Sequence, residues 1–111
     1  MKVEQAFTAL ADAIREHGQP ICQQTDPEYW FPEAGGERYE SLVAKKYCGE
    51  CPVQMQCALY AIAADEAYGI WGGLNDRQRV DVRNGRVSLE QAFKMSEVRS
   101  AKVRLPISHR Q

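Results

Sequence analysis

The chain has 111 residues, of which 44% are hydrophobic and 26% are charged, as in an ordinary single globular domain. These values exclude wholesale disorder, and no apolar run is long enough to span a bilayer. The charge is uneven: residues 1–75 carry five Lys and Arg against eleven Asp and Glu, whereas residues 76–111 carry nine against four. A basic end on an acidic body is typical of contact with nucleic acid or an acidic partner, and a solvated helix surface explains it equally well.

The N-terminal half predicts two helices separated by an aromatic loop. The first is an amphipathic helix, because apolar residues recur with helical spacing at Val3, Phe7, Leu10 and Ile14. Its charged sequence has no apolar core of the kind found in a signal peptide, so we expect a cytoplasmic protein. Residues 22–36 contain prolines and end in two glycines, which predicts a loop, and residues 37–47 predict a short second helix.

The C-terminal half predicts three more helices. Pro52 is a suitable first residue for a third helix, which Gly69 would end. The stretch "GIWGG" then predicts a glycine turn around Trp71.

The last two helices carry cap signals. Asn75 or Asp76 would begin one that Gly85 stops, and Ser88 with Gln91 forms a capping box for the other. No long stretch alternates with period two, so the sequence predicts an all-α fold of four to five short helices.

Four cysteines are the main chemical signal, in the pattern C-x25-C-x2-C-x5-C: Cys22, Cys48, Cys51 and Cys57. A disulfide framework, a zinc site, an iron–sulfur cluster and a redox enzyme are all open to such a set. Structural zinc sites usually combine two closely spaced pairs, and His17 and His109 lie too far apart in sequence to supply one. Ligation of a [4Fe–4S] cluster by four thiolates suits these unequal spacings better, although zinc stays open.

The cysteines and their flanking motifs resemble the WhiB-like family of actinobacteria and their phages. The matching features are C-x2-C-x5-C, the later "GIWGG" and the aromatic "DPEYWFP" after the first cysteine, together covering about residues 21–81. The resemblance implies a small helical domain wrapped around one [4Fe–4S] cluster on the four cysteines. It also implies a transcriptional regulator that responds to nitric oxide or oxygen. Residues 1–20 form an N-terminal helical extension, and residues 82–111 form a basic C-terminal helix and tail.

The resemblance further implies that a monomer binds region 4 of the principal sigma factor in a 1:1 complex. The matching positions are Trp30, Phe31, Pro32, Gly69, Trp71, Gly72 and Gly73. The competing interpretation is that the aromatic residues form a small core around the cluster. Some family members also contact promoter DNA through a C-terminal basic element. This chain has only dispersed candidates there: Arg83, Arg86, Lys94, Arg99, Lys102 and Arg104.

The sequence leaves several rival functions open. The C-x2-C pair is the spacing of dithiol oxidoreductases, so the cluster-free form is a candidate protein disulfide reductase. The strand-rich setting of a thioredoxin-like site is missing from the sequence, however, and we do not expect an enzyme. A zinc-stabilised adaptor and a phage-encoded antagonist of a host WhiB-like regulator also stay open.

Overall fold

The computed structural model describes residues 2–24, 30 and 39–104, and most of them belong to five α-helices. No β-strand occurs among these residues, and the all-α prediction is confirmed. None of the helices in the described ranges is both long and apolar enough to cross a membrane. In chain order the elements are α1 (Val3–His17), the short 3-10 helix η1 (Ile21–Gln23), α2 (Tyr39–Gly49), α3 (Gln54–Ala64), α4 (Asp76–Arg83) and α5 (Leu89–Ser100).

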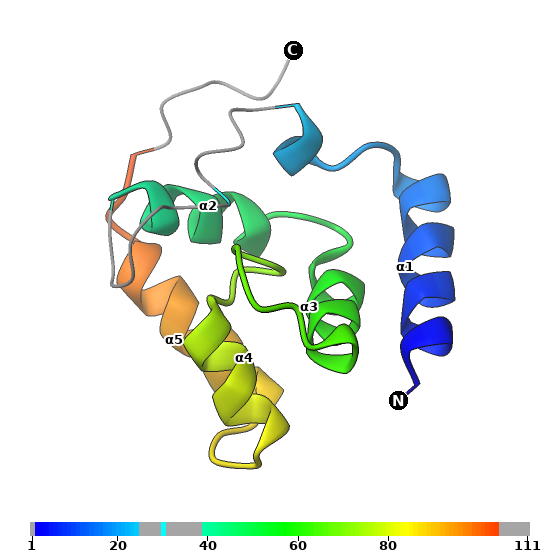
Figure 1. Ribbon diagram of the computed structural model, residues 1–111. Helices are drawn as coiled ribbons and strands as arrows, with labels where there is room; N and C mark the ends of the chain where they lie inside the picture. Colours follow the sequence, from blue (N-terminus) through cyan, green and yellow to red (C-terminus); the bar gives the residue numbers. More distant parts are fainter. Residues whose placement is uncertain (1, 25–29, 31–38, 105–111) are drawn as a thin grey trace.

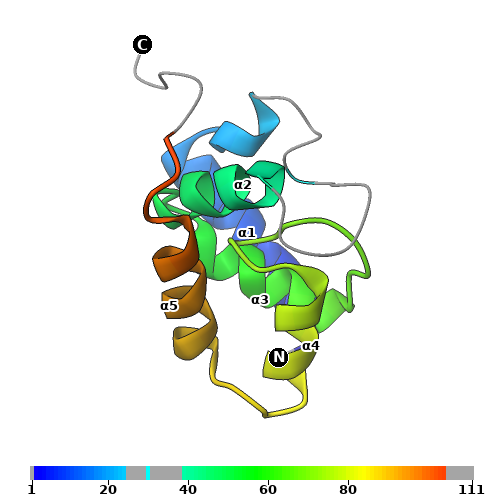
Figure 2. The same cartoon turned by 90° about the vertical axis from the view of Figure 1, so that its left-hand side faces the viewer.

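The helix α3 lies in the middle of the molecule, with α1 packed on one side and α4 on the other (Figure 1). In the perpendicular view α1 lies behind α3 (Figure 2). The helix α5 packs against both α2 and α4, so the C-terminal part of the chain returns to the elements that surround the cysteines.

Two groups of buried side chains hold these helices together. The first joins α2 to the segments that precede and follow it, and consists of Trp30, Val43, Ala44, Tyr47, Cys48 and Ile70. The second joins α3, α4 and α5, and consists of Ala58, Leu74 and Ala92, with Val82, Val87, Leu89 and Phe93 partly buried against it. Burial of this apolar surface supplies most of the stabilising free energy of so small a domain.

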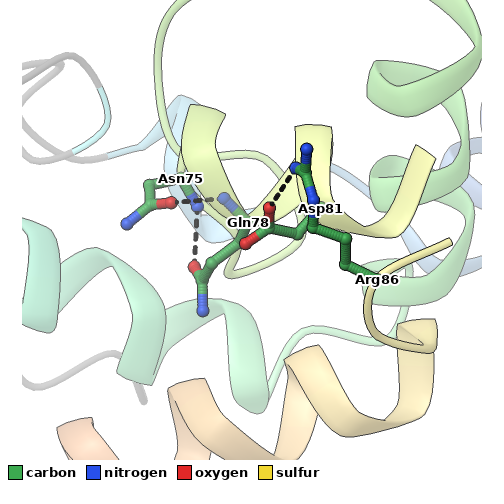
Figure 3. A network of polar contacts seen from close by, with 4 residues as sticks. All are labelled: Asn75, Gln78, Asp81 and Arg86. Carbon is green, nitrogen blue, oxygen red and sulfur yellow. Dashed lines mark hydrogen bonds and ion pairs between the residues drawn. The ribbon is translucent and has the colours of Figure 1, made fainter. Parts of the chain in front are cut away.

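Both C-terminal helices begin with a capping box. At α4 the Asn75 side chain accepts from the Gln78 N–H at 2.8 Å, and the Gln78 side chain accepts from the Asn75 N–H at 2.9 Å (Figure 3). Ser88 and Gln91 form the same reciprocal pair at α5. Each box satisfies two N–H groups that a helix terminus leaves without intrahelical partners. The predicted box at Ser88 is confirmed, and Asn75 rather than Asp76 caps α4.

Helix α3 is shorter than the sequence predicts, since it begins after Pro52 and ends before Gly69. Asp65 takes the left-handed conformation at its C-terminus, with φ 57°. The N–H groups of Asp65 and Glu66 bond back to carbonyls of the last turn. Aspartate tolerates this conformation better than most side chains, so the helix closes without a glycine.

Helix α1 turns only part of its predicted apolar stripe toward the protein. Ala6 and Ala13 are its buried residues, whereas Phe7 is 57% exposed and Val3 is 41% exposed. The close approach of α1 to α3 therefore depends on small side chains, and two large ones remain in contact with solvent.

The cap of α4 is testable by mutation. Asn75→Ala removes the acceptor for the Gln78 N–H, and we expect it to lower the free energy of unfolding by about 1 kcal/mol. Urea or thermal unfolding measures the change. Asn84→Ala is the control, because Asn84 lies at the other end of α4 and is exposed. Equal stability of the two variants would show that the capping box contributes nothing.

Candidate metal centre

All four cysteines line one cavity of about 240 Å³. Cys22 comes from η1, Cys48 from the last turn of α2, Cys51 from the following turn and Cys57 from α3. All are free thiols. The cavity wall is completed largely by apolar side chains, among them Leu10, Ile14, Trp30 and Ile70. The structure thus gathers the distant Cys22 with the three clustered cysteines.

A run of helix-like hydrogen bonds positions the three clustered cysteines. The Cys51 N–H donates to the Cys48 carbonyl at 3.0 Å, and the Gln54 N–H donates to the Cys51 carbonyl at 3.2 Å. The Cys57 N–H then donates to the Val53 carbonyl at 2.9 Å. Because the backbone turns continuously between α2 and α3, side chains separated by three and six residues reach the same cavity.

Burial makes the thiolate forms unfavourable. Desolvation is the largest cause of the raised pKa of Cys57, which is about 12, and the nearby Cys22 thiolate adds to the rise. A hydrogen bond from the Gly72 N–H and the charge of Arg79 oppose it. Desolvation is also the main reason for the raised pKa of Cys48 and of Cys22. Several thiolates can coexist here only if a positive charge compensates them, as a bound metal centre does.

The arrangement is compatible with an iron–sulfur cluster. A structural zinc site brings all its ligands to a single tetrahedral ion. Among the described residues, no group of three or more His, Cys, Asp or Glu side chains is placed to hold one metal ion. The four thiols instead surround a cavity, and a [4Fe–4S] cluster takes one thiolate at each of its iron corners.

The glycine turn after α3 packs directly against the cysteine-bearing elements. A Cβ atom on Gly72 would lie 2.7 Å from both the Ala58 Cβ and the Gln54 carbonyl oxygen. A Cβ atom on Gly73 would lie 3.3 Å from the Cys48 Cβ. Both glycines have positive φ, 61° and 84°. Only glycine meets both the spatial and the conformational requirement of Gly72.

Arg79 of α4 holds this loop from inside. Its guanidinium group, on a residue only 3% exposed, donates to four backbone carbonyls: Gly69 at 2.8 Å, Leu74 at 2.6 Å, Glu66 at 3.1 Å and Tyr68 at 3.4 Å. Burial lowers the pKa of Arg79, but Asp76 and the Cys57 thiolate oppose this, and an arginine stays charged in proteins. Arg79 therefore places a fixed positive charge near the thiols.

Two further side chains bind the same loop. Gln54 donates to the Gly72 carbonyl at 3.1 Å, and Ser96 of α5 donates to the Gly73 carbonyl at 2.7 Å. Sequence reasoning missed Gln54, Arg79 and Ser96. In the sequence Arg79 is only one charge of the basic C-terminal part, and nothing in its spacing distinguishes a buried arginine from an exposed one.

The predicted partner-binding aromatic residues occupy different environments. Trp30 is 4% exposed and stacks on Tyr47 at a ring-centroid distance of 5.8 Å, and its carbonyl accepts from the Ile70 N–H at 2.6 Å. In this conformation Trp30 is a core residue, as the competing interpretation of the aromatic residues expects. Trp71 is half-buried, and its indole N–H donates to the Tyr68 carbonyl at 2.9 Å. Phe31 and Pro32 lie outside the described residues.

The six candidate DNA-binding residues are all exposed: Arg83, Arg86, Lys94, Arg99, Lys102 and Arg104. Arg83 and Arg86 form ion pairs within the chain, and Arg99 also has an interaction partner there. Arg83 lies 2.5 Å from the Asp65 carboxylate, and Arg86 lies 3.0 Å from that of Asp81 (Figure 3). These exposed pairs contribute little to stability but reduce the positive charge offered to DNA phosphates.

Comparison with known proteins identifies the family. The sequence profile described as "Transcription factor WhiB" matches residues 17–82. The chain belongs to the WhiB family. It is 51% identical over 65 residues to the transcriptional regulator WhiB2 of Mycobacterium tuberculosis, covering 59% of this chain and 70% of that protein. It is also 51% identical over 71 residues to the transcriptional regulator WhiB of Streptomyces coelicolor, covering 61% and 78%.

A more distant WhiB relative carries a redox description. The redox-responsive transcriptional regulator WhiB3 of Mycolicibacterium smegmatis is 39% identical over 64 residues, covering 53% of this chain and 66% of that protein. The WhiB segment contains all four cysteines and the glycine turn, whereas nearly all of α1 and the whole of α5 lie outside it. Family membership, predicted from the motifs, is confirmed.

The close packing of Gly72 predicts a large effect of one methyl group. Gly72→Ala should lower the free energy of unfolding by about 2–4 kcal/mol, from overpacking together with the positive φ, and should reduce iron content because Gly72 contacts Cys57. Gly85→Ala is the matched control: its φ is also positive, but none of the residues that the structure describes lies within 4 Å of the added carbon. It should cost only about 1 kcal/mol and retain iron. Similar losses in both variants would mean that the turn is not tightly packed.

Proposed function

We propose that this WhiB-family protein is a transcriptional regulator whose four cysteines hold one [4Fe–4S] cluster. The observation that carries the proposal is the single cavity lined by Cys22, Cys48, Cys51 and Cys57. The relatives named above are described as transcriptional regulators, which supports the regulatory role.

The residues around the thiols fit such a group. The four sulfurs supply its ligands, and the fixed charge of Arg79 and the Gly72 N–H offset its negative charge. The apolar side chains of Leu10, Ile14 and Ile70 line the same cavity and would limit the access of water to the cluster. When bound, the cluster supplies a centre that reacts with nitric oxide or oxygen. The redox description of the WhiB3 relative supports a sensing role for this chain.

The proposed partner is region 4 of the principal sigma factor, bound by a monomer in the cytoplasm. The proposed surface is the loop that carries Trp71, together with Phe31 and Pro32; within this loop Gly69 is half-buried, and Gly72 and Gly73 are buried against the helices beneath it. Trp71 is a large aromatic residue on a loop whose carbonyls are held by buried side chains, and such preorganised aromatic residues provide strong interface contacts. Trp30 supports this loop from inside, through its hydrogen bond to Ile70. A phage-encoded antagonist of a host regulator would use the same surface.

The rival functions receive less support. A catalytic dithiol needs a thiol of lowered pKa, whereas burial raises the pKa of Cys48. DNA contact receives less support because at least three of the six candidate residues already have partners within the chain: Arg83, Arg86 and Arg99. Promoter DNA thus remains a secondary proposed partner.

Loss of any cysteine should prevent cluster binding. Cys22→Ala, Cys48→Ala, Cys51→Ala and Cys57→Ala should each sharply lower iron and acid-labile sulfide in anaerobically purified protein, because no neighbouring side chain replaces the missing bond. Ser41→Ala, a buried change of similar size in α2, should retain both. Full iron in Cys22→Ala would remove Cys22 from the ligand set. Zinc in place of iron and sulfide would contradict the cluster.

Trp71 should be important for sigma binding but not for iron. Trp71→Ala should weaken binding of the iron-loaded protein to sigma region 4 by about 2 kcal/mol or more, the scale of an interface hot spot. Calorimetry or a quantitative pull-down measures the loss, with iron determined on the same samples. Val98→Ala, an exposed apolar change on α5, should bind normally. Normal binding by Trp71→Ala, or loss of iron together with binding, would contradict the proposed surface.

A further inference from the structure

An aromatic row connects α1 to the glycine turn. The Phe7 and Tyr60 rings meet edge to face, with centroids 6.0 Å apart, and the Tyr60 and Trp71 rings meet at 5.7 Å. Both distances fall in the range of favourable aromatic contacts. The three rings come from α1, α3 and the loop before α4, so they join the N-terminal extension to the loop that carries Trp71.

The row is exposed at both ends. Phe7 is 57% exposed, and Val3, one helical turn away on α1, is 41% exposed. At the other end lies Tyr68, which is 79% exposed and whose carbonyl accepts the Trp71 indole N–H. Exposed aromatic and apolar side chains grouped in this way are typical of an interaction site.

The exposed Phe7 and Val3 side chains are not needed to attach α1 to the rest of the protein. Ala6 and Ala13 are buried, and Leu10 and Ile14 line the cysteine cavity, so these four residues already secure α1 to the protein. Phe7 adds an edge contact to Tyr60 and leaves more than half of its own surface in water. Moreover, this part of α1 precedes residue 17, where the WhiB match begins.

The charges beside the row favour a basic partner. Glu4 lies one helical turn before Phe7, and Glu66 precedes Tyr68 in the loop after α3. Residues 1–75 as a whole carry five basic against eleven acidic side chains. A protein that binds the phosphates of DNA carries a basic surface, to which these carboxylates are complementary.

We propose that Phe7 and Val3 extend the sigma-binding surface of the Trp71 loop onto α1. Region 4 then contacts the aromatic row together with Tyr68, which lies at its Trp71 end. The proposal rests on the proposed function, because it adds to the same interface. It makes α1 a part of partner recognition, in addition to its role in covering the cysteine cavity.

The test compares Phe7→Ala with Trp71→Ala and Val98→Ala in binding of the iron-loaded protein to sigma region 4. Phe7→Ala should weaken binding at least tenfold and leave iron content and helix content near those of the wild type. The unfolding temperature should fall by no more than a few degrees, because the change also removes the edge contact to Tyr60. Alanine is the better helix former, so the change does not disfavour α1 itself. Val98→Ala should bind as the wild type does. Glu4→Gln should slow association at low salt, since charges at an interface edge act mainly on the association rate.

The outcomes separate this inference from the proposed function. Normal binding by Phe7→Ala with weak binding by Trp71→Ala would overturn the role of α1 and leave the sigma interface intact. Normal binding by both variants would overturn the sigma interface itself. A concentration-dependent dimer that Phe7→Ala converts to monomer, with sigma binding unchanged, would assign the row to self-association and overturn the inference.

Discussion

The loop between α3 and α4 depends on one buried cation. Arg79 supplies the donors for four carbonyls that turn inward, and it does so from a helix whose own start is fixed by the Asn75 cap. An unsatisfied buried carbonyl costs about 1–3 kcal/mol, so a loop of this shape is unstable without such a donor. A guanidinium group can serve several acceptors at once because its donors point outward in a fixed plane.

The same loop connects the cysteine cavity to the molecular surface. Gly72 contacts Cys57 and α3 on its inner side, and Trp71 lies next to it in the chain. Ser96 adds a bond from α5, which lies outside the WhiB match. The C-terminal helix therefore contributes to the loop geometry whether or not its basic residues contact DNA.

The sequence is sufficient for those features that depend on local rules. Ser88 and Gln91 mark the start of α5 because capping boxes are local, and the cysteine pattern together with the glycine turn identifies the family. The predicted end of α3 is wrong, because Asp65 takes a conformation for which glycine is the usual choice. The sequence leaves two interpretations of Trp30 open and does not predict the burial of Arg79, since both depend on contacts between segments far apart in the chain. The grouping of Phe7 with Tyr60 and Trp71 requires the packing of α1 on α3, which periodicity alone does not give.

The internal hydrogen bonds of the loop from Glu66 to Leu74 have an entropic consequence. Ordering a flexible residue on binding costs roughly 1–2 kcal/mol in backbone entropy, and a mobile loop incurs that cost at every position. Here Gln54, Arg79 and Ser96 restrict the backbone before any partner arrives. In the proposed interface, contacts made by Trp71 would therefore not have to offset the loss of backbone freedom in the loop that carries it, and a smaller surface would suffice for binding.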